Sequence, residues 1–340
     1  MKYRKLGATR LMVSEVGFGV WTVSTGWWGT VDESTGVRLL QEALGHGITL
    51  FDTADTYGEG LGETMLAKAF PKRRHDLVIA TKVGYDFYTF QEREGHRERP
   101  QDFTPAFVRY ACEQSLRRLR TEYIDLYQLH NPKMDALERD DLFALLDQLV
   151  REGKIRSFGV ALGPDIGWKD EGLFAMAQRR VPAMQVIYSL LEPEPARAFF
   201  PQAEKHNTGL LARVPHASEV LTDKFSQVPA FPQGDHRALR RAQWLRQAFE
   251  KRQRLLFLAQ GTGRTLAQAA IQFCLAQPTI GSVLPNITSR EELLEYSRAN
   301  EVPDLTPGEL VRIDELLQHG FFQEQAGGRP APEEAGSPAP

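Results

Sequence analysis

Four ionisable side chains have the types and spacing needed for proton transfer. Asp52, Lys82 and His130 each lie at the end of a short apolar segment, and Tyr57 follows Asp52 by five residues. A free tyrosine titrates near pH ~10, too high for an efficient acid at neutral pH, but a nearby ammonium stabilises the phenolate and makes the hydroxyl a better acid. The set therefore indicates proton donation by Tyr57, with Lys82 as the charge and Asp52 as its buried partner. His130 would donate a hydrogen bond to a substrate oxygen.

Each of these side chains alone has a simpler structural explanation. An Asp at a strand end is more often a turn or cap residue, a single His is usually a structural residue with satisfied hydrogen bonds, and a Lys at a strand end usually extends to water. Chance does not readily place three such groups on consecutive strands with a tyrosine just beyond the first. We therefore interpret the four residues as one site.

The segments that carry these residues belong to a longer alternation along the chain. Short β-branched segments alternate with segments of helical period, and several of the latter open with a cap, at Thr104, Thr265 and Ser289. The predicted strands are 16–20, 49–54, 77–83, 124–130, 155–162, 183–189, 209–214 and 281–286. Eight strand–helix units predict an α/β fold of the (β/α)₈ TIM-barrel class. A doubly wound sheet also alternates, but the glycine-rich turn G-x-G-x-x-G typical of its dinucleotide-binding members is absent.

In a barrel of this kind the site lies at the carboxyl ends of the strands. Side chains alternate along a strand, so Asp52, Lys82 and His130 point to the same side as small or apolar neighbours two or four residues earlier. These neighbours are Leu50, Ala80 and Leu126. The alternation therefore predicts that the three ionisable groups meet at the barrel mouth.

Further segments surround the eight units. Residues 2–16 predict a β-hairpin that closes the barrel floor, and helical patterns at 237–260 and 306–319 predict two extra helices. The end of the chain is rich in Pro, Gly and Ala. We expect one barrel domain over residues 1–322 and a disordered tail over 323–340.

Composition limits the partners. The 340 residues are 42% hydrophobic and 25% charged, with a net charge of −3, so no general basic field attracts nucleic acid or an acidic membrane. The two cysteines, Cys112 and Cys274, fall in helical patterns and are expected to be core residues in a reducing compartment. The sequence has neither a secretory leader nor a long apolar segment, which predicts a cytoplasmic protein. The oligomeric state stays open.

Three segments carry a resemblance to a known family. FDTADTYGEG, VIATKVG and YIDLYQLHNP resemble signature segments of the aldo-keto reductases, in order and with similar spacing over about residues 1–320. The resemblance implies a (β/α)₈ barrel that reduces aldehydes and ketones with NADP(H), and also with NAD(H). Carried over residue by residue, it makes Asp52, Tyr57, Lys82 and His130 the catalytic set and Tyr57 the general acid.

The resemblance also implies cofactor contacts. They fall on Gly19, Val20, Trp21, Asp52, Gln185, Arg213, Ser218, Asn286 and Arg290. Two positions depart from the family pattern: Ala161 and Leu162 replace a Ser-Asn pair that binds the nicotinamide amide. Glu292 also stands where a phosphate donor is expected, so the preference for NADPH over NADH is expected to be modest.

The substrate, a small carbonyl compound, is expected to meet an aromatic wall. The expected substrate contacts are Trp21, Trp27, Trp28, Tyr57, Tyr85 and His130. No metal is expected, because the remaining histidines lack the spacing of metal ligands, and this also disfavours a metal-dependent barrel enzyme. The second interpretation is a regulatory or sensor subunit of the same fold that binds nicotinamide nucleotide with little turnover.

Overall fold

The structure is a computed structural model that describes residues 1–90, 98–163, 168–232 and 234–322. The chain divides into two compact units, Met1–Leu305 and Thr306–Pro340. The barrel lies in the first unit. The predicted disordered tail, 323–340, lies outside the described residues.

The first unit contains an eight-stranded parallel sheet whose strands are neighbours in chain order. The strands are β3 (Phe18–Gly19), β4 (Leu50–Asp52), β5 (Val78–Val83), β6 (Ile124–His130), β7 (Ile155–Ala161), β8 (Ala183–Ile187), β9 (Gly209–Arg213) and β10 (Ile280–Leu284). The sheet closes where the Gly17 amide donates to the Val283 carbonyl at 2.9 Å and the Val283 amide to that of Glu15 at 2.8 Å. The predicted (β/α)₈ barrel and its eight strands are confirmed.

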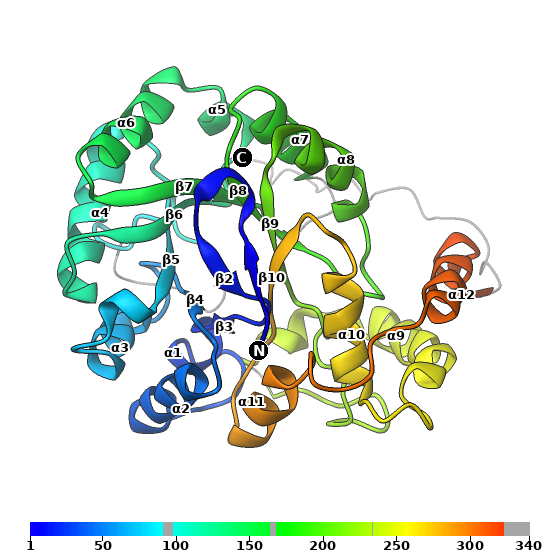
Figure 1. Ribbon diagram of the computed structural model, residues 1–340. Helices are drawn as coiled ribbons and strands as arrows, with labels where there is room; N and C mark the ends of the chain where they lie inside the picture. Colours follow the sequence, from blue (N-terminus) through cyan, green and yellow to red (C-terminus); the bar gives the residue numbers. More distant parts are fainter. Residues whose placement is uncertain (91–97, 164–167, 233, 323–340) are drawn as a thin grey trace, which may run out of the picture. The chain divides into compact units, whose positions relative to one another are not determined.

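Helices follow the strands on the outside of the barrel (Figure 1). They are α1 (Trp21–Ser24), α2 (Glu33–Gly45), α3 (Leu61–Ala69), α4 (Pro105–Leu119), α5 (Met134–Leu137), α6 (Asp140–Arg151), α7 (Lys169–Ala177), α8 (Ala196–His206), α9 (Ala242–Leu255), α10 (Leu266–Leu275) and α11 (Arg290–Ser297). Short 3₁₀ turns lie at η1 (Gly7–Thr9), η2 (Arg74–Asp76), η4 (His236–Leu239) and η5 (Leu256–Leu258). Helix α9, with η4 and η5, is the predicted insertion at 237–260.

The helices begin where the predicted caps stand. The hydroxyls of Thr104, Thr265 and Ser289 accept hydrogen bonds from backbone amides in the first turns of α4, α10 and α11. Each cap satisfies an amide that has no partner within its helix.

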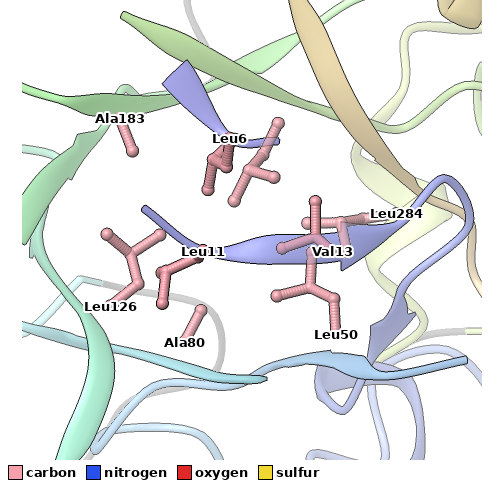
Figure 2. Close-up of a cluster of buried hydrophobic side chains, with 9 residues drawn as sticks. Leu6, Leu11, Val13, Leu50, Ala80, Leu126, Ala183 and Leu284 are labelled. Carbon is pink, nitrogen blue, oxygen red and sulfur yellow. The ribbon is translucent and has the colours of Figure 1, made fainter. Parts of the chain in front are cut away.

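A two-stranded hairpin closes the other end of the barrel. Strands β1 (Tyr3–Lys5) and β2 (Met12–Ser14) pair antiparallel, and Figure 2 shows Leu6, Leu11 and Val13 turned toward side chains from the barrel strands. Those barrel side chains are Leu50, Ala80, Leu126, Ala183, Leu211 and Leu284. The predicted floor hairpin is therefore present, and the layer above it contains Leu50, Ala80 and Leu126, which the strand alternation had placed on the same side as the ionisable groups.

One glycine makes this closure possible. Gly7 has a φ of +48°, and a Cβ placed there would lie 2.1 Å from the backbone nitrogen of Gly209 on β9. Only a residue without a side chain allows this approach and this backbone conformation.

The second unit contains α12 (Pro307–Gln318) and η6 (Gly320–Phe322). Helix α12 is the second predicted extra helix. It begins with a capping box in which Thr306 and Glu309 satisfy each other's backbone amides. No helix within the described ranges has both the length and the apolar character needed to cross a membrane.

Candidate active site

Lys82 and Asp52 form a buried ion pair at the barrel mouth. They lie on the neighbouring strands β5 and β4, and the Lys82 ammonium donates to Asp52 Oδ1 at 2.5 Å and to the Thr53 carbonyl at 2.7 Å. Lys82 is 1% exposed and Asp52 is 5% exposed. A charge this deeply buried is tolerated only with a partner of opposite sign, so the pair fixes both groups in position.

The second oxygen of Asp52 is held by two amides. Gln128 Nε2 on β6 donates to Asp52 Oδ2 at 3.1 Å, and Gln185 Nε2 on β8 donates to it at 2.9 Å. Gln185 was expected to contact the cofactor, and in the structure its amide binds the Asp52 carboxylate. Gln128 was not among the predicted site residues, although its position two residues before His130 on the same strand face was a usable signal.

The structure brings Tyr57 together with the other three members of the predicted set. Tyr57 lies in the loop between β4 and α3, and the Lys82 ammonium is 4.8 Å from the centre of its ring. The rings of Tyr57 and His130 meet edge to face with their centres 5.7 Å apart. Tyr57 is only part-buried, whereas its three neighbours are buried. A part-buried phenol thus lies beside a buried positive charge.

His130 lies at the end of β6 in an environment that keeps its ring neutral. Burial, and then the positive charges of Lys82 and Arg213, hold the pKa of His130 well below its usual value. Its Nδ1 is buried and accepts or donates no hydrogen bond within the described residues. Tyr85 packs edge to face against the same ring at 5.0 Å, with its hydroxyl bound to the Asn131 side chain at 2.8 Å.

Arg213 ends β9 and reaches toward the end of β7. Its Nη2 donates to the Leu162 carbonyl at 2.9 Å, and burial lowers its pKa from the usual value. Ala161 and Leu162 are both buried. Their apolar side chains cannot bind an amide, and the polar groups shown at this position are the Leu162 carbonyl and the Arg213 guanidinium.

The three tryptophans after β3 connect two loops. Trp21 meets Trp28 edge to face at 5.5 Å and Trp27 at 6.2 Å, and the Trp27 ring stacks on that of His236 at 6.3 Å. Trp28 is 5% exposed, and its indole N–H donates to Glu219 at 3.0 Å. Trp28 therefore packs toward the loop after β9, while Trp21 and Trp27 stay part-exposed.

Of the remaining predicted cofactor residues, Gly19 ends β3, Arg290 begins α11, and Val20, Asn286 and Ser218 lie on three loops. The Val20 amide, next to Gly19, donates to the Asp52 carbonyl at 2.8 Å. The Thr22 hydroxyl donates to the Ile287 carbonyl at 2.9 Å, which ties the loop after β3 to the loop that contains Asn286.

The third of these loops, after β9, contains Ser218. The Ser218 hydroxyl accepts from Arg240 Nε at 3.1 Å, and Arg240 also forms a two-bond ion pair with Glu192 at 2.7 and 2.9 Å. Arg290, the predicted phosphate contact on α11, is exposed and pairs with Glu42 on α2 at 2.7 Å. The sequence did not predict Arg240 as a neighbour of Ser218, because the two residues are 22 positions apart and meet through an irregular loop.

The two cysteines are buried, as the sequence predicted. Burial raises the pKa of the Cys112 thiol to about 12. Among the described residues, no three His, Cys, Asp or Glu side chains are arranged to hold a metal ion.

Comparisons with known proteins agree with this fold. The model of the aldo/keto reductase family matches residues 15–318. A Bacillus subtilis protein named as the uncharacterized oxidoreductase YqkF is 29% identical over 95% of this chain and 99% of its own length. A probable voltage-gated potassium channel subunit beta of Arabidopsis thaliana is 26% identical over 94% of this chain and 97% of its own.

A solved structure gives the same result. The aldo-keto reductase AKR11C1 from Bacillus halodurans superposes with a TM-score of 0.75 and 31% identity, covering 93% of this chain and 96% of the other. The chain belongs to the aldo/keto reductase family, whose members are oxidoreductases that act on carbonyl compounds.

Proposed function

We propose that the protein reduces aldehydes and ketones to alcohols with NADPH or NADH, and that Tyr57 protonates the carbonyl oxygen. The observation that carries this proposal is the buried Lys82–Asp52 pair beneath Tyr57, with His130 beside the ring. Family membership supports carbonyl reduction in general.

Each of the four residues has one task. Tyr57 gives its proton to the carbonyl oxygen, and the Lys82 ammonium stabilises the phenolate that remains. Asp52 positions Lys82, and Gln128 and Gln185 in turn hold Asp52. The neutral His130 ring donates a hydrogen bond that orients the substrate oxygen without adding a second positive charge.

A nicotinamide cofactor, when bound, supplies the hydride. The residues near the barrel mouth fit such a group. Gln128 Oε1 and His130 Nδ1 are buried with no hydrogen-bond partner among the described residues. Both atoms could therefore form a hydrogen bond with a bound group. Arg213 would face the nicotinamide, with the Leu162 backbone in place of the usual side-chain amide contacts.

The remaining cofactor contacts would come from the loops. Gly19, Val20 and Trp21 would cover the nicotinamide, and Ser218 and Asn286 would meet the phosphates. Trp21, Trp27 and Tyr85 would line the substrate pocket: Tyr85 packs on the His130 ring, and the two tryptophans follow β3, the strand next to β4. Trp28 would act through packing, since its indole is turned toward Glu219.

The test is the loss of reduced-cofactor absorbance when the protein is given an activated aldehyde such as a nitrobenzaldehyde. We expect turnover with NADPH and with NADH. A folded protein that binds either cofactor but leaves the absorbance unchanged with every aldehyde tested would contradict the proposal.

The second candidate function is a nucleotide-binding subunit with little turnover. Two observations favour it: the similarity to the Arabidopsis protein named as a potassium channel subunit beta, and the apolar Ala161 and Leu162 in the predicted amide site. Tight cofactor binding together with turnover that stays slow for every carbonyl substrate would support this candidate instead.

A further inference from the structure

We propose that Glu292 is an internal substitute for a ligand phosphate and selects against a cofactor with a phosphorylated ribose. The inference rests on the proposed function, and it assigns the selectivity to Glu292, with Lys224 and Glu219 as its partners. It predicts that the protein's own carboxylate occupies the donors that a 2′-phosphate would need.

The Glu292 carboxylate is bound as a phosphate would be bound. Its Oε2 accepts from the Thr288 amide at 2.7 Å and from the Thr288 hydroxyl at 2.9 Å, and its Oε1 accepts from the Lys224 ammonium at 3.1 Å. A backbone amide just before a helix, a hydroxyl and an ammonium are typical phosphate donors. All three already bind an anion that belongs to the chain.

Lys224 is shared between two carboxylates. Its ammonium also donates to Glu219 Oε1 at 3.0 Å, and the Glu219 side chain is buried. Two negative groups thus neutralise one cation and connect the loop after β9 to α11. An incoming phosphate would have to displace one carboxylate from Lys224 while lying close to the other.

The neighbouring cation is engaged in the same way. Arg237 is buried and forms ion pairs with Asp235 at 2.6 Å and with Glu219. Two cations, Lys224 and Arg237, therefore face the three carboxylates of Glu219, Asp235 and Glu292. The group carries an excess negative charge, which repels an added phosphate dianion.

Two other groups near the expected phosphate site offer no replacement. Arg290 pairs with Glu42 on α2. Tyr296 is buried against the His216 ring, with the ring centres 4.5 Å apart. The affinity of this end of the site for a ligand phosphate therefore depends on the Glu292 carboxylate.

The experiment compares two adenosine nucleotides by calorimetric titration of the full chain. Adenosine 2′,5′-bisphosphate carries the extra phosphate of NADP, and adenosine 5′-monophosphate lacks it. The wild-type protein should bind the bisphosphate no more than about tenfold more tightly than the monophosphate. In Glu292→Ala the freed Thr288 and Lys224 donors should improve the ratio of the two Kd values by about tenfold or more, equivalent to about 1.4 kcal/mol.

Glu291→Ala is the matched control, because Glu291 lies in the same first turn of α11 with an exposed side chain. It removes the same charge and should leave the ratio within about twofold of wild type. Equal shifts in both variants, or no shift in Glu292→Ala, would overturn the inference. A wild-type preference for the bisphosphate of a thousandfold would overturn it while leaving the proposed reductase intact. Failure of every variant to bind either nucleotide would overturn the proposed function with it.

Discussion

At the scale of single residues, the proposed chemistry depends on one buried ion pair. Lys82 and Asp52 are almost without contact to water, so the electrostatic influence of the ammonium on its surroundings is only weakly screened. The centre of the Tyr57 ring lies 4.8 Å from that ammonium. A buried ion pair adds little to stability compared with apolar packing, so stability alone does not account for this pair.

Lys82→Met should abolish most of the turnover and also weaken the fold. The phenolate loses its stabilising charge, and Asp52 is left buried and unpaired, which typically costs about 3–5 kcal/mol. Turnover and urea unfolding of the same sample measure the two effects.

Lys68→Met is the matched control for this substitution. Lys68 forms an exposed ion pair with Glu33, so its loss should cost under about 1 kcal/mol and leave turnover unchanged. Wild-type rates in Lys82→Met would remove the electrostatic basis of the mechanism.

The residues of the proposed catalytic set could be picked out from the sequence, whereas several of their hydrogen-bond and ion-pair partners could not. Residue type and strand alternation were enough to place Asp52, Lys82 and His130 together. The contact between Glu292 and Lys224 joins residues 68 positions apart through an irregular loop, and no periodicity predicts it. The pairing of Arg240 with Ser218 was missed for the same reason.

At the scale of elements, the floor hairpin stabilises the barrel from the end opposite the site. Leu6→Ala should lower the free energy of unfolding by about 2–5 kcal/mol, because Leu6 is fully buried in the apolar layer and its loss leaves a cavity. Met12→Ala in β2 is the control, since Met12 is 55% exposed and should cost little. Chemical denaturation of both variants measures these free energies of unfolding. Equal losses in the two variants would show that the hairpin is not part of the core.

His216, in the loop after β9, makes the stability of the fold depend on pH. Burial lowers the pKa of His216 to about 4, and its Nε2 lies 3.2 Å from the Ala267 carbonyl. In the unfolded chain a histidine titrates near ~6.5, so as the pH falls from about 6.5 toward 4 the unfolded state takes up the proton first. The stability that depends on neutral His216 is therefore fully present above about pH 6.5 and is lost as the pH falls.

His216→Leu should remove this dependence. Between pH ~7 and ~5 the wild-type protein should lose about 2 kcal/mol more stability than the variant. Urea unfolding of each protein at both pH values gives the stability that it loses between them. A packing change that does not depend on pH affects both values equally and cancels. Identical losses in both proteins would show that His216 takes up its proton equally readily in the folded state.

Element positions followed from the sequence, whereas some element ends did not. The strand predicted at 16–20 is reduced to Phe18–Gly19, because Val16 forms only an isolated bridge to Val283 and Val20 adopts helical angles ahead of α1. The strand predicted to reach residue 189 ends at Ile187, since Ser189 enters a turn bonded to Glu192. These two differences arise from contacts that form only in the folded chain.

At the scale of the whole molecule, the barrel brings together residues that the chain keeps far apart. The site uses β4, β5, β6, β8 and β9, and their order around the sheet follows their order in the chain. Alternation and the count of eight units were sufficient to predict this arrangement. The proposed phosphate site was harder to predict, because it lies on long loops whose charged side chains pair with one another.

The cofactor preference should reflect that neutralisation. We expect the kcat/KM values for NADPH and NADH with one aldehyde to differ by less than about 100-fold, which corresponds to under about 2.8 kcal/mol. The two values must be measured at one ionic strength, because salt screens phosphate contacts. A preference for NADPH of several thousand-fold would show a cationic pocket that the ion pairs of Lys224 and Arg237 do not provide.

The central claim is that Tyr57 is the acid of a carbonyl reduction, and the most direct test is aldehyde turnover by the wild-type protein and by Tyr57→Phe, with cofactor binding measured on both. The variant keeps the ring that packs on His130 and lacks only the hydroxyl. Turnover should fall by a factor of about 10²–10⁴, the usual contribution of general acid catalysis, while the Kd of the cofactor stays within about twofold. Near-wild-type turnover in Tyr57→Phe would contradict the account.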